Sequence, residues 1–129
     1  MRAAKLLIVV LICAVCAVAA DLTGAYKGTW SGNNGSGDIQ LTFKAVDGNS
    51  SKAEASFTYN GETIPCHVTS VKVNGSQVQM VYDFEIDGRQ MQTTMTGQLK
   101  NKTMDGSYKT KSLPDGSEVD EGTWKAATT

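Results

Sequence analysis

Cys66 and His67 are neighbours in the chain, and their side chains suit nucleophilic catalysis by a thiol that an imidazole activates. Ile64, Cys66 and Val68 are apolar or small at alternate positions, which predicts a β-strand with these three facing inward. Adjacent residues of a strand point to opposite faces, so His67 would face outward. We therefore expect no Cys-His catalytic pair.

Three carboxylates at alternate positions, Asp83, Glu85 and Asp87, would lie on one face of a strand. Such a row suits a loose Ca²⁺ site, but it is more typical of a solvated acidic face. The chain has no nucleophile elbow, no paired metal-binding histidines and no phosphate-binding glycine loop that leads into a helix. We expect neither an enzyme nor a bound metal or cofactor.

Turn signals divide the rest of the chain at even intervals of 13 or 14 residues. Asn, Asp and Gly tolerate the positive φ that two-residue hairpin turns require. The signals are Asp47-Gly48, Asn60-Gly61, Asn74-Gly75, Asp87-Gly88, Asn101-Lys102 and Asp115-Gly116.

Between the turns lie runs of alternating apolar and polar residues, which predict strands. The eight runs cover about 24–31, 38–46, 52–59, 62–73, 76–86, 89–99, 103–112 and 117–126. We predict an all-β fold, an eight-stranded antiparallel up-and-down meander closed into a small barrel, because closure removes exposed strand edges.

Two-residue turns also fix which residues face one another. The inward residues predicted in this way are Tyr26, Trp30, Ile39, Leu41, Phe43, Ala55, Phe57, Ile64, Val68, Val78, Met80, Tyr82, Phe84, Met91, Met95, Leu99, Met104, Tyr108 and Trp124. In the run 62–73, the turns at either end predict that Val68 and Val71 both face inward. A regular strand would point these two side chains to opposite faces, because one position is even and the other odd. A one-residue β-bulge near Thr69-Ser70 would reconcile them.

An eight-stranded barrel is either filled by its own side chains or holds one small ligand. If it holds a ligand, we expect the wall of the site to include Trp30, Phe43, Tyr82, Phe84, Met95 and Tyr108. Gly97 and Gly106 face each other in mid-strand; they either leave room for a ligand or permit sharp coiling of the strands.

The opening strand, Gly28-Thr29-Trp30, resembles that of the calycins, the lipocalin and avidin group of barrels. The resemblance implies a calycin-like barrel closed at one end by the tryptophan, with a small apolar molecule bound inside. With Gly32, it also resembles the haem-binding nitrobindin-like barrels. Those use a histidine near the C-terminal end, whereas His67 is mid-chain, so no haem is expected. A second Gly-Thr-Trp ends at Trp124, and we expect the two indole rings toward opposite ends of the seam between the first and last strands.

Residues 1–20 are typical of a secretory signal peptide, with Arg2 and Lys5 before an apolar core of 13 residues and a small-residue cleavage site. The core is too short for stable membrane insertion. We expect cleavage, a secreted or periplasmic location and a single domain over 21–129. Cys13 and Cys16 would leave with the signal, so the mature chain would have only Cys66 and no internal disulfide.

Without Arg2 and Lys5, ten basic residues stand against 13 acidic ones, a net charge of −3. A mildly acidic chain without a Lys/Arg cluster argues against nucleic acid and anionic membranes as partners. Two functions remain: a carrier of a small apolar or aromatic ligand inside the barrel, or a filled barrel whose surface binds a protein partner, as an inhibitor or envelope component would. A cavity of about 300 Å³ or more would favour the carrier. An enzyme would require a polar residue inside the barrel with a shifted pKa.

Overall fold

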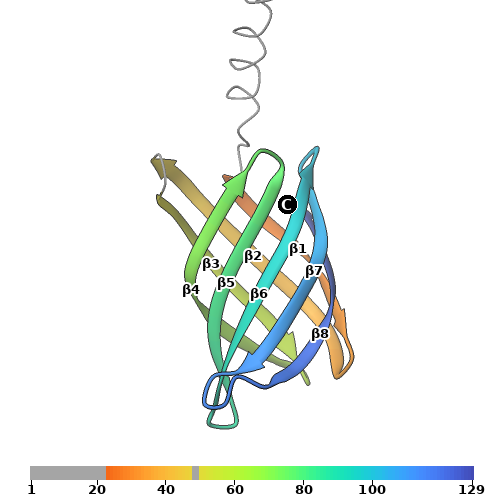
Figure 1. Ribbon diagram of the computed structural model, residues 1–129. Coiled ribbons are helices and arrows are strands. Elements are labelled where there is room, and N and C mark those ends of the chain that lie inside the picture. The colour runs from red at the N-terminus through yellow and green to blue at the C-terminus, as the bar shows by residue number, and fades with distance from the viewer. Residues whose placement is uncertain (1–22, 48–49) are drawn as a thin grey trace, which may run out of the picture.

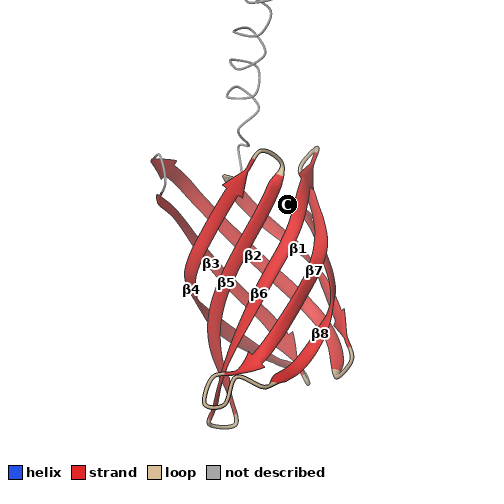
Figure 2. Ribbon diagram, in the orientation of Figure 1, coloured by secondary structure: helices blue, strands red, loops and turns tan. Residues whose placement is uncertain are grey.

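Eight β-strands and no helices make up the part of the chain that the computed structural model describes, residues 23–47 and 50–129 (Figure 2). The strands are β1 (Gly24–Gly32), β2 (Gly35–Asp47), β3 (Ser50–Tyr59), β4 (Glu62–Asn74), β5 (Gln77–Ile86), β6 (Arg89–Lys100), β7 (Thr103–Ser112) and β8 (Glu118–Thr128). Within these ranges no helix is long and apolar enough to cross a membrane. The predicted signal peptide, with Cys13 and Cys16, lies outside the described residues.

Each strand pairs antiparallel with its neighbours in the sequence, and β1 also pairs with β8 (Figure 1). The predicted all-β, eight-stranded antiparallel meander closed into a barrel is therefore confirmed. Closure leaves no strand edge of the barrel unpaired, which a flat meander of the same strands would not achieve.

Two-residue turns lie at three of the predicted steps, Asn60-Gly61, Asp87-Gly88 and Asn101-Lys102. The turn predicted at Asn74-Gly75 lies one residue later, at Gly75-Ser76, because Asn74 pairs with Gln77. The prediction of a two-residue turn at Asp115-Gly116 is wrong, because residues 113–117 form a five-residue connection. Asn60 and Asp87 have φ of 52° and 53°, and the glycines that follow them have φ of 80° and 79°. Positive φ at both central residues is the type I′ geometry that matches the twist of the flanking strands.

The hairpins β1–β2, β3–β4, β5–β6 and β7–β8 lie at one end of the barrel, the lower end in Figure 1. We call this end the mouth and the opposite end the base.

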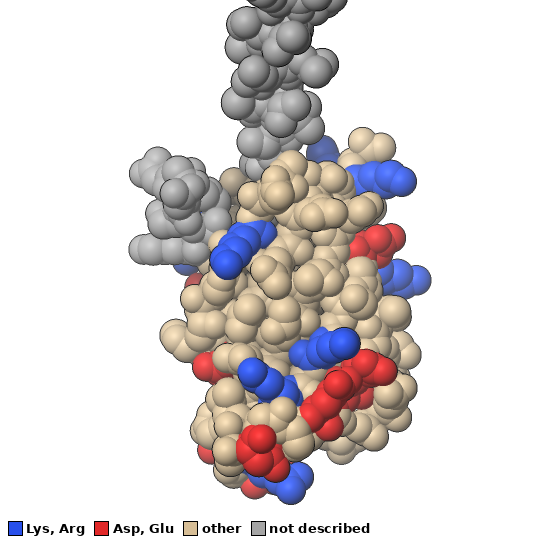
Figure 3. Space-filling model, in the orientation of Figure 1, with Lys and Arg blue, Asp and Glu red and all other residues tan. Residues whose placement is uncertain are grey.

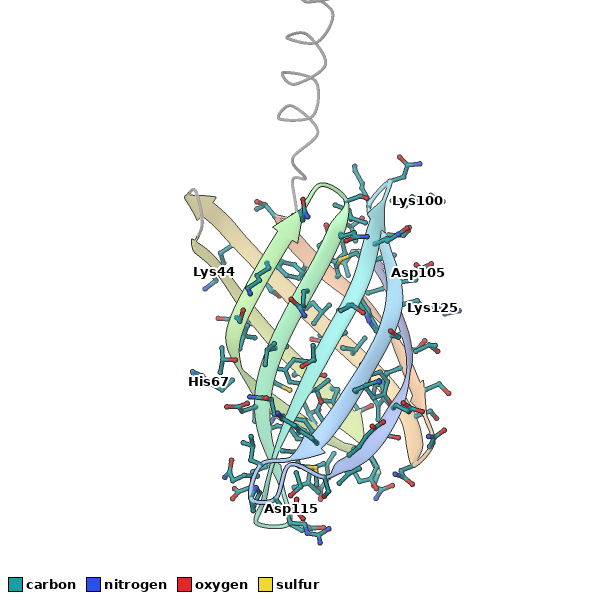
Figure 4. The ribbon with its side chains drawn as sticks, viewed as in Figure 1. Lys44, His67, Lys100, Asp105, Asp115 and Lys125 are labelled. Atoms are coloured by element: carbon teal, nitrogen blue, oxygen red, sulfur yellow. The ribbon has the colours of Figure 1, made fainter. Side chains whose placement is uncertain are left out.

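The bulge predicted near Thr69-Ser70 is confirmed. Val68 pairs with Tyr82 and Ser70 pairs with Val81, so Thr69 has no partner residue on β5. Its hydroxyl instead donates a hydrogen bond to the Val81 carbonyl over 3.2 Å. His67 is exposed and points away from the barrel (Figure 4), on the opposite face of β4 from Cys66.

The predicted inward face forms the core, with small departures. Val68, Met91 and Leu99 are only partly buried. Thr93 and Thr110 are buried, 2% and 5% exposed, although sequence analysis did not place them inside. The buried apolar residues are Tyr26, Trp30, Ile39, Leu41, Phe43, Ala55, Phe57, Ile64, Val78, Met80, Tyr82, Phe84, Met95, Met104, Tyr108, Trp124 and Ala126.

The expectation that Trp30 and Trp124 lie toward opposite ends of the seam is wrong, because the two residues pair directly across β1 and β8. The reason is a stagger between the strands. Gly32, the last residue of β1, pairs with Gly122, so residues 118–121 of β8 extend past the end of β1 toward the mouth. Barrel closure requires such a stagger, and it brings Trp124 level with Trp30.

Candidate functional site

A cavity of about 480 Å³ opens at the mouth of the barrel. It reaches from the turns of the mouth to Met95 and Trp124 in the interior. The residues that line it are Trp30, Asn34, Ile39, Phe57, Tyr59, Asn60, Tyr82, Phe84, Ile86, Asp87, Arg89, Met91, Thr93, Met95, Tyr108, Thr110, Val119, Asp120 and Trp124. The barrel is thus hollow toward the mouth.

Five of the six residues predicted for a ligand wall line this cavity: Trp30, Tyr82, Phe84, Met95 and Tyr108. The sixth, Phe43, does not line it. Phe43 pairs with Gly24 near the base and packs edge-on against Tyr26, with ring centroids 5.7 Å apart. Phe43 therefore belongs to the packed half of the barrel.

Aromatic rings form a connected chain around the cavity, which we call the aromatic belt: Tyr82, Phe84, Phe57, Trp30 and Tyr108. Phe57 meets Phe84 edge-on at 5.0 Å and Trp30 at 5.8 Å, both between ring centroids. Trp30 also meets Tyr108 edge-on at 6.2 Å. Edge-to-face contacts are the favoured geometry for aromatic pairs. The belt links alternate strands β5, β3, β1 and β7.

Polar side chains cross four adjacent strands of the same wall, and we call them the polar row: Tyr82, Thr93, Thr110 and Asp120. Tyr82 pairs with Thr93 across β5 and β6, Thr93 with Thr110 across β6 and β7, and Thr110 with Asp120 across β7 and β8. The two buried threonine hydroxyls share a short hydrogen bond, and Tyr82 lies beside Thr93 on the adjacent strand. The wall thus presents three neighbouring hydroxyl side chains.

Asp120, at one end of the polar row, forms hydrogen bonds with residues of β7 and of the β1–β2 turn at the mouth. Its carboxylate accepts a hydrogen bond from the Tyr108 hydroxyl over 2.8 Å and another from the Asn34 backbone N–H over 3.1 Å. Gly32 lies beneath this junction, where a Cβ would collide with the Tyr108 hydroxyl. The absent side chain at Gly32 therefore lets Tyr108 reach Asp120.

Burial raises the pKa of both tyrosines of the cavity well above the ordinary range. For Tyr82, the nearby Cys66 raises the pKa further and the neighbouring Thr93 hydroxyl lowers it. For Tyr108, the hydrogen bond and charge of Asp120 add to the effect of burial. Both phenols stay protonated at neutral pH, so each keeps an O–H group that can donate a hydrogen bond.

Trp30 and Trp124 are anchored on opposite sides of the seam. The Trp30 indole N–H donates to the Thr58 carbonyl on β3 over 3.2 Å. The Trp124 N–H is shared between the carbonyls of Thr96 and Ser107, at 3.2 Å each. Buried indoles usually find such partners, and here they hold the rings in place.

Glycines make room for these rings. A Cβ at Gly97 would lie 2.6 Å from the Trp124 ring, and one at Gly106 would collide with the Thr96 carbonyl. Neither glycine lines the cavity. The close approach of the strands and of the Trp124 ring is thus a further reason for this pair, beside the two considered from the sequence, room for a ligand and sharp coiling of the strands.

Charged groups at the site gather at the rim. Asp87 lies in the β5–β6 turn and Arg89 directly follows it, both exposed, and Asp120 of β8 also lines the cavity. Figure 3 shows acidic and basic side chains interspersed over the face in view. Asp83 and Glu85 accept hydrogen bonds from glutamine side chains of β6. In the described ranges, no three or more His, Cys, Asp or Glu residues gather as a metal site would require.

Sequence analysis missed Thr93 and Thr110 in the site, although a signal for both was present. Thr93 lies at the alternate position between Met91 and Met95, both predicted to face inward, and Thr110 lies two residues after the inward-facing Tyr108. Parity alone predicts that they face inward, whereas their polarity argued for solvent. Asp120 shares the parity of Trp124 in the same way, whereas Asn34 lies in a turn and has no such signal. Both reach the site because β8 extends past β1.

No protein-family model, curated protein or solved structure gives a significant match to this chain. The class of the protein follows from its fold and site alone. It is a small eight-stranded antiparallel β-barrel with a cavity at one end, an architecture compatible with a calycin-like fold.

Proposed function

We propose that this protein is a carrier that binds a small apolar or aromatic molecule in the cavity at the mouth. The observation that carries the proposal is the volume of about 480 Å³, which exceeds the roughly 300 Å³ expected of a small-molecule site. A barrel filled by its own side chains would leave no such space.

The lining supports a ligand with a large apolar surface. Trp30, Phe57 and Phe84 present aromatic rings, and Met95 adds a flexible thioether that adapts to irregular shapes. Such a wall gains affinity by removing apolar ligand surface from water. The packed base, with Phe43 and Tyr26, forms the floor beneath it.

Binding without catalysis is part of the proposal. Tyr82 meets the requirement stated for an enzyme, a polar residue inside the barrel with a shifted pKa, but the shift keeps its phenol protonated, so we assign it as a hydrogen-bond donor rather than a base. The Tyr108 hydroxyl already donates to Asp120. Burial raises the pKa of the Cys66 thiol to about 12, which keeps it from forming the reactive thiolate near neutral pH. A calycin relationship, and secretion through the signal peptide over 1–20, complete the proposal and rest on the sequence.

The test is native mass spectrometry of the mature protein purified from its own host, repeated after denaturation. A discrete mass lost on denaturation identifies the cargo. Met91→Trp, which adds bulk beside the mouth, should abolish that mass. Gln92→Trp, the adjacent substitution on the outer face, is the matched control and should retain it.

A clean apo mass in the wild-type protein would contradict the carrier proposal. It would instead favour the second function considered from the sequence, a barrel whose surface binds a protein partner. Retention of the cargo in Met91→Trp would show that the bound molecule lies outside the cavity.

A further inference from the structure

The two sides of the cavity differ in chemistry. In a closed barrel of eight strands, β2 lies across from β6 and β3 across from β7. Ile39 and Phe57, from β2 and β3, thus face the wall that carries Thr93 and Thr110. One side is apolar, and the other carries the polar row.

The hydroxyl groups of the polar row can donate to a ligand. Thr93 and Thr110 contribute two O–H groups, and one hydrogen bond joins them. That bond uses one proton, so the other threonine O–H is left to donate to another group. Tyr82, on the next strand of the same wall, adds a phenol that stays protonated. A ligand atom that accepts a hydrogen bond would satisfy such a donor, and leaving it without a partner in an apolar site is costly.

Charge at the site disfavours an anion. Arg89, the one basic residue that lines the cavity within the described chain, is exposed at the rim beside Asp87. Asp120 sits at the end of the polar row, where its carboxylate would repel a buried ligand carboxylate. The interior therefore offers hydrogen-bond donors without a positive charge.

From these relationships, we propose that the cavity selects a neutral, flat ring compound that carries a hydrogen-bond acceptor, such as a carbonyl oxygen, on one edge. The acceptor meets the hydroxyls of Tyr82, Thr93 and Thr110, and the ring packs against Ile39 and Phe57. The inference rests on the proposed carrier function and narrows its ligand to a chemical class.

Three ring compounds of similar size test which ligand class the cavity prefers. 2-Acetylnaphthalene carries a neutral carbonyl acceptor, 2-ethylnaphthalene lacks an acceptor, and 2-naphthoate is negatively charged. Titration is followed by the emission of Trp30 and Trp124, the chain's two tryptophans, both of which line the cavity. We expect the ketone to bind about tenfold more tightly than either other probe, the effect of one well-formed hydrogen bond.

One combined variant tests the assigned contacts. Tyr82→Phe/Thr93→Val/Thr110→Val removes all three hydroxyls and keeps the shape of each side chain, so that no remaining hydroxyl of the set can take over as donor. It should reduce ketone affinity to that of 2-ethylnaphthalene and leave the affinity for 2-ethylnaphthalene unchanged. Tyr26→Phe is the matched control, because Tyr26 is equally buried but lies outside the cavity lining. It should leave all three affinities unchanged.

The outcomes separate this inference from the function on which it rests. Equal binding of ketone and ethyl probes, or tightest binding of naphthoate, would overturn the ligand class while leaving the carrier function intact. Unchanged ketone affinity in Tyr82→Phe/Thr93→Val/Thr110→Val would also overturn it. Failure of all three probes to bind, together with a clean apo mass, would overturn both proposals.

Discussion

Trp30 and Trp124 face each other across the seam where the first and last strands close the barrel, yet their indoles are anchored on different sides of it. Trp30 donates to Thr58 on β3, and Trp124 donates to Thr96 on β6 and Ser107 on β7. The pair thus connects the seam to strands on both of its flanks. Because both rings also line the cavity, the same residues close the fold and form the proposed site.

Replacing either tryptophan with phenylalanine should destabilise the barrel. Trp30→Phe and Trp124→Phe each remove one hydrogen-bonded N–H and leave space beside a packed ring. We expect each to lower the free energy of unfolding by about 1–3 kcal/mol. Urea denaturation measures the change. Leu113→Ala is the control, because Leu113 is 39% exposed and its loss should cost less than about 0.5 kcal/mol. Equal stability of Trp124→Phe and wild type would contradict the anchoring role.

A methyl group at Gly37 should disturb Trp30. A Cβ there would collide with the Thr58 carbonyl and lie 2.9 Å from the Trp30 indole nitrogen. We expect Gly37→Ala to destabilise the protein by about 2 kcal/mol or more and to shift the tryptophan emission. Ser36→Ala, at an exposed neighbouring position, should change neither quantity. Wild-type stability and emission in Gly37→Ala would show that β2 and β3 are not in close contact at this point.

Asp120 should control the ionisation of Tyr108. Burial and the Asp120 carboxylate together raise the pKa of the Tyr108 phenol. Asp120→Asn removes the negative charge, so the pKa should fall while remaining above its ordinary value because burial persists. Ultraviolet titration of tyrosinate measures this change, and Tyr108→Phe identifies the step that belongs to Tyr108 among the four tyrosines. An unchanged titration in Asp120→Asn would contradict the contact.

Stability should fall in alkaline solution. Burial raises the pKa of Cys66 to about 12 in the folded protein, whereas an unfolded thiol ionises near 8.5. The unfolded chain loses its proton first, so the contribution of Cys66 is fully present below about pH 8.5 and is lost as the pH rises toward about 12. The free energy of unfolding should therefore decrease over this window.

Tyr82 and Tyr108 add to that decrease at higher pH, because their folded pKa values are also raised and an unfolded tyrosine ionises near 10. Urea denaturation at pH 7.5 and pH 9.5 isolates the contribution of the thiol. In Cys66→Ala the difference between these two pH values should be smaller than in wild type. The same difference in both proteins would show that the Cys66 thiol is not desolvated.

Much of the fold could be predicted because turn chemistry acts locally. Asn60-Gly61 and Asp87-Gly88 fix two-residue turns, and each such turn sets the register of its hairpin. The bulge at Thr69 could be predicted because the turns at the two ends of β4 place even-numbered side chains inward in its first half and odd-numbered side chains inward in its second half. The candidate site was less predictable. Five of the six predicted wall residues line the cavity. The sixth, Phe43, also faces inward but lies toward the base of the barrel. The alternation of a strand predicts which face a side chain lies on, but not how deep in the barrel it lies.

The sequence by itself determined the number of strands, their pairing order and which side chains point inward, because positive φ at the turns and the two-residue repeat of a strand are local properties. Only the tertiary structure decided that Trp30 meets Trp124, that Asp120 reaches Tyr108 and that the barrel is hollow at one end. The contact of Asp120 with Tyr108 depends on the register of β7 and β8, which a five-residue connection and a register shift between Thr110 and Lys111 set in place of a regular two-residue turn. The pairing of Trp30 with Trp124 depends on the stagger between β1 and β8, the one pairing that no hairpin sets. That stagger is fixed when the whole sheet closes, through the packing of side chains from every strand.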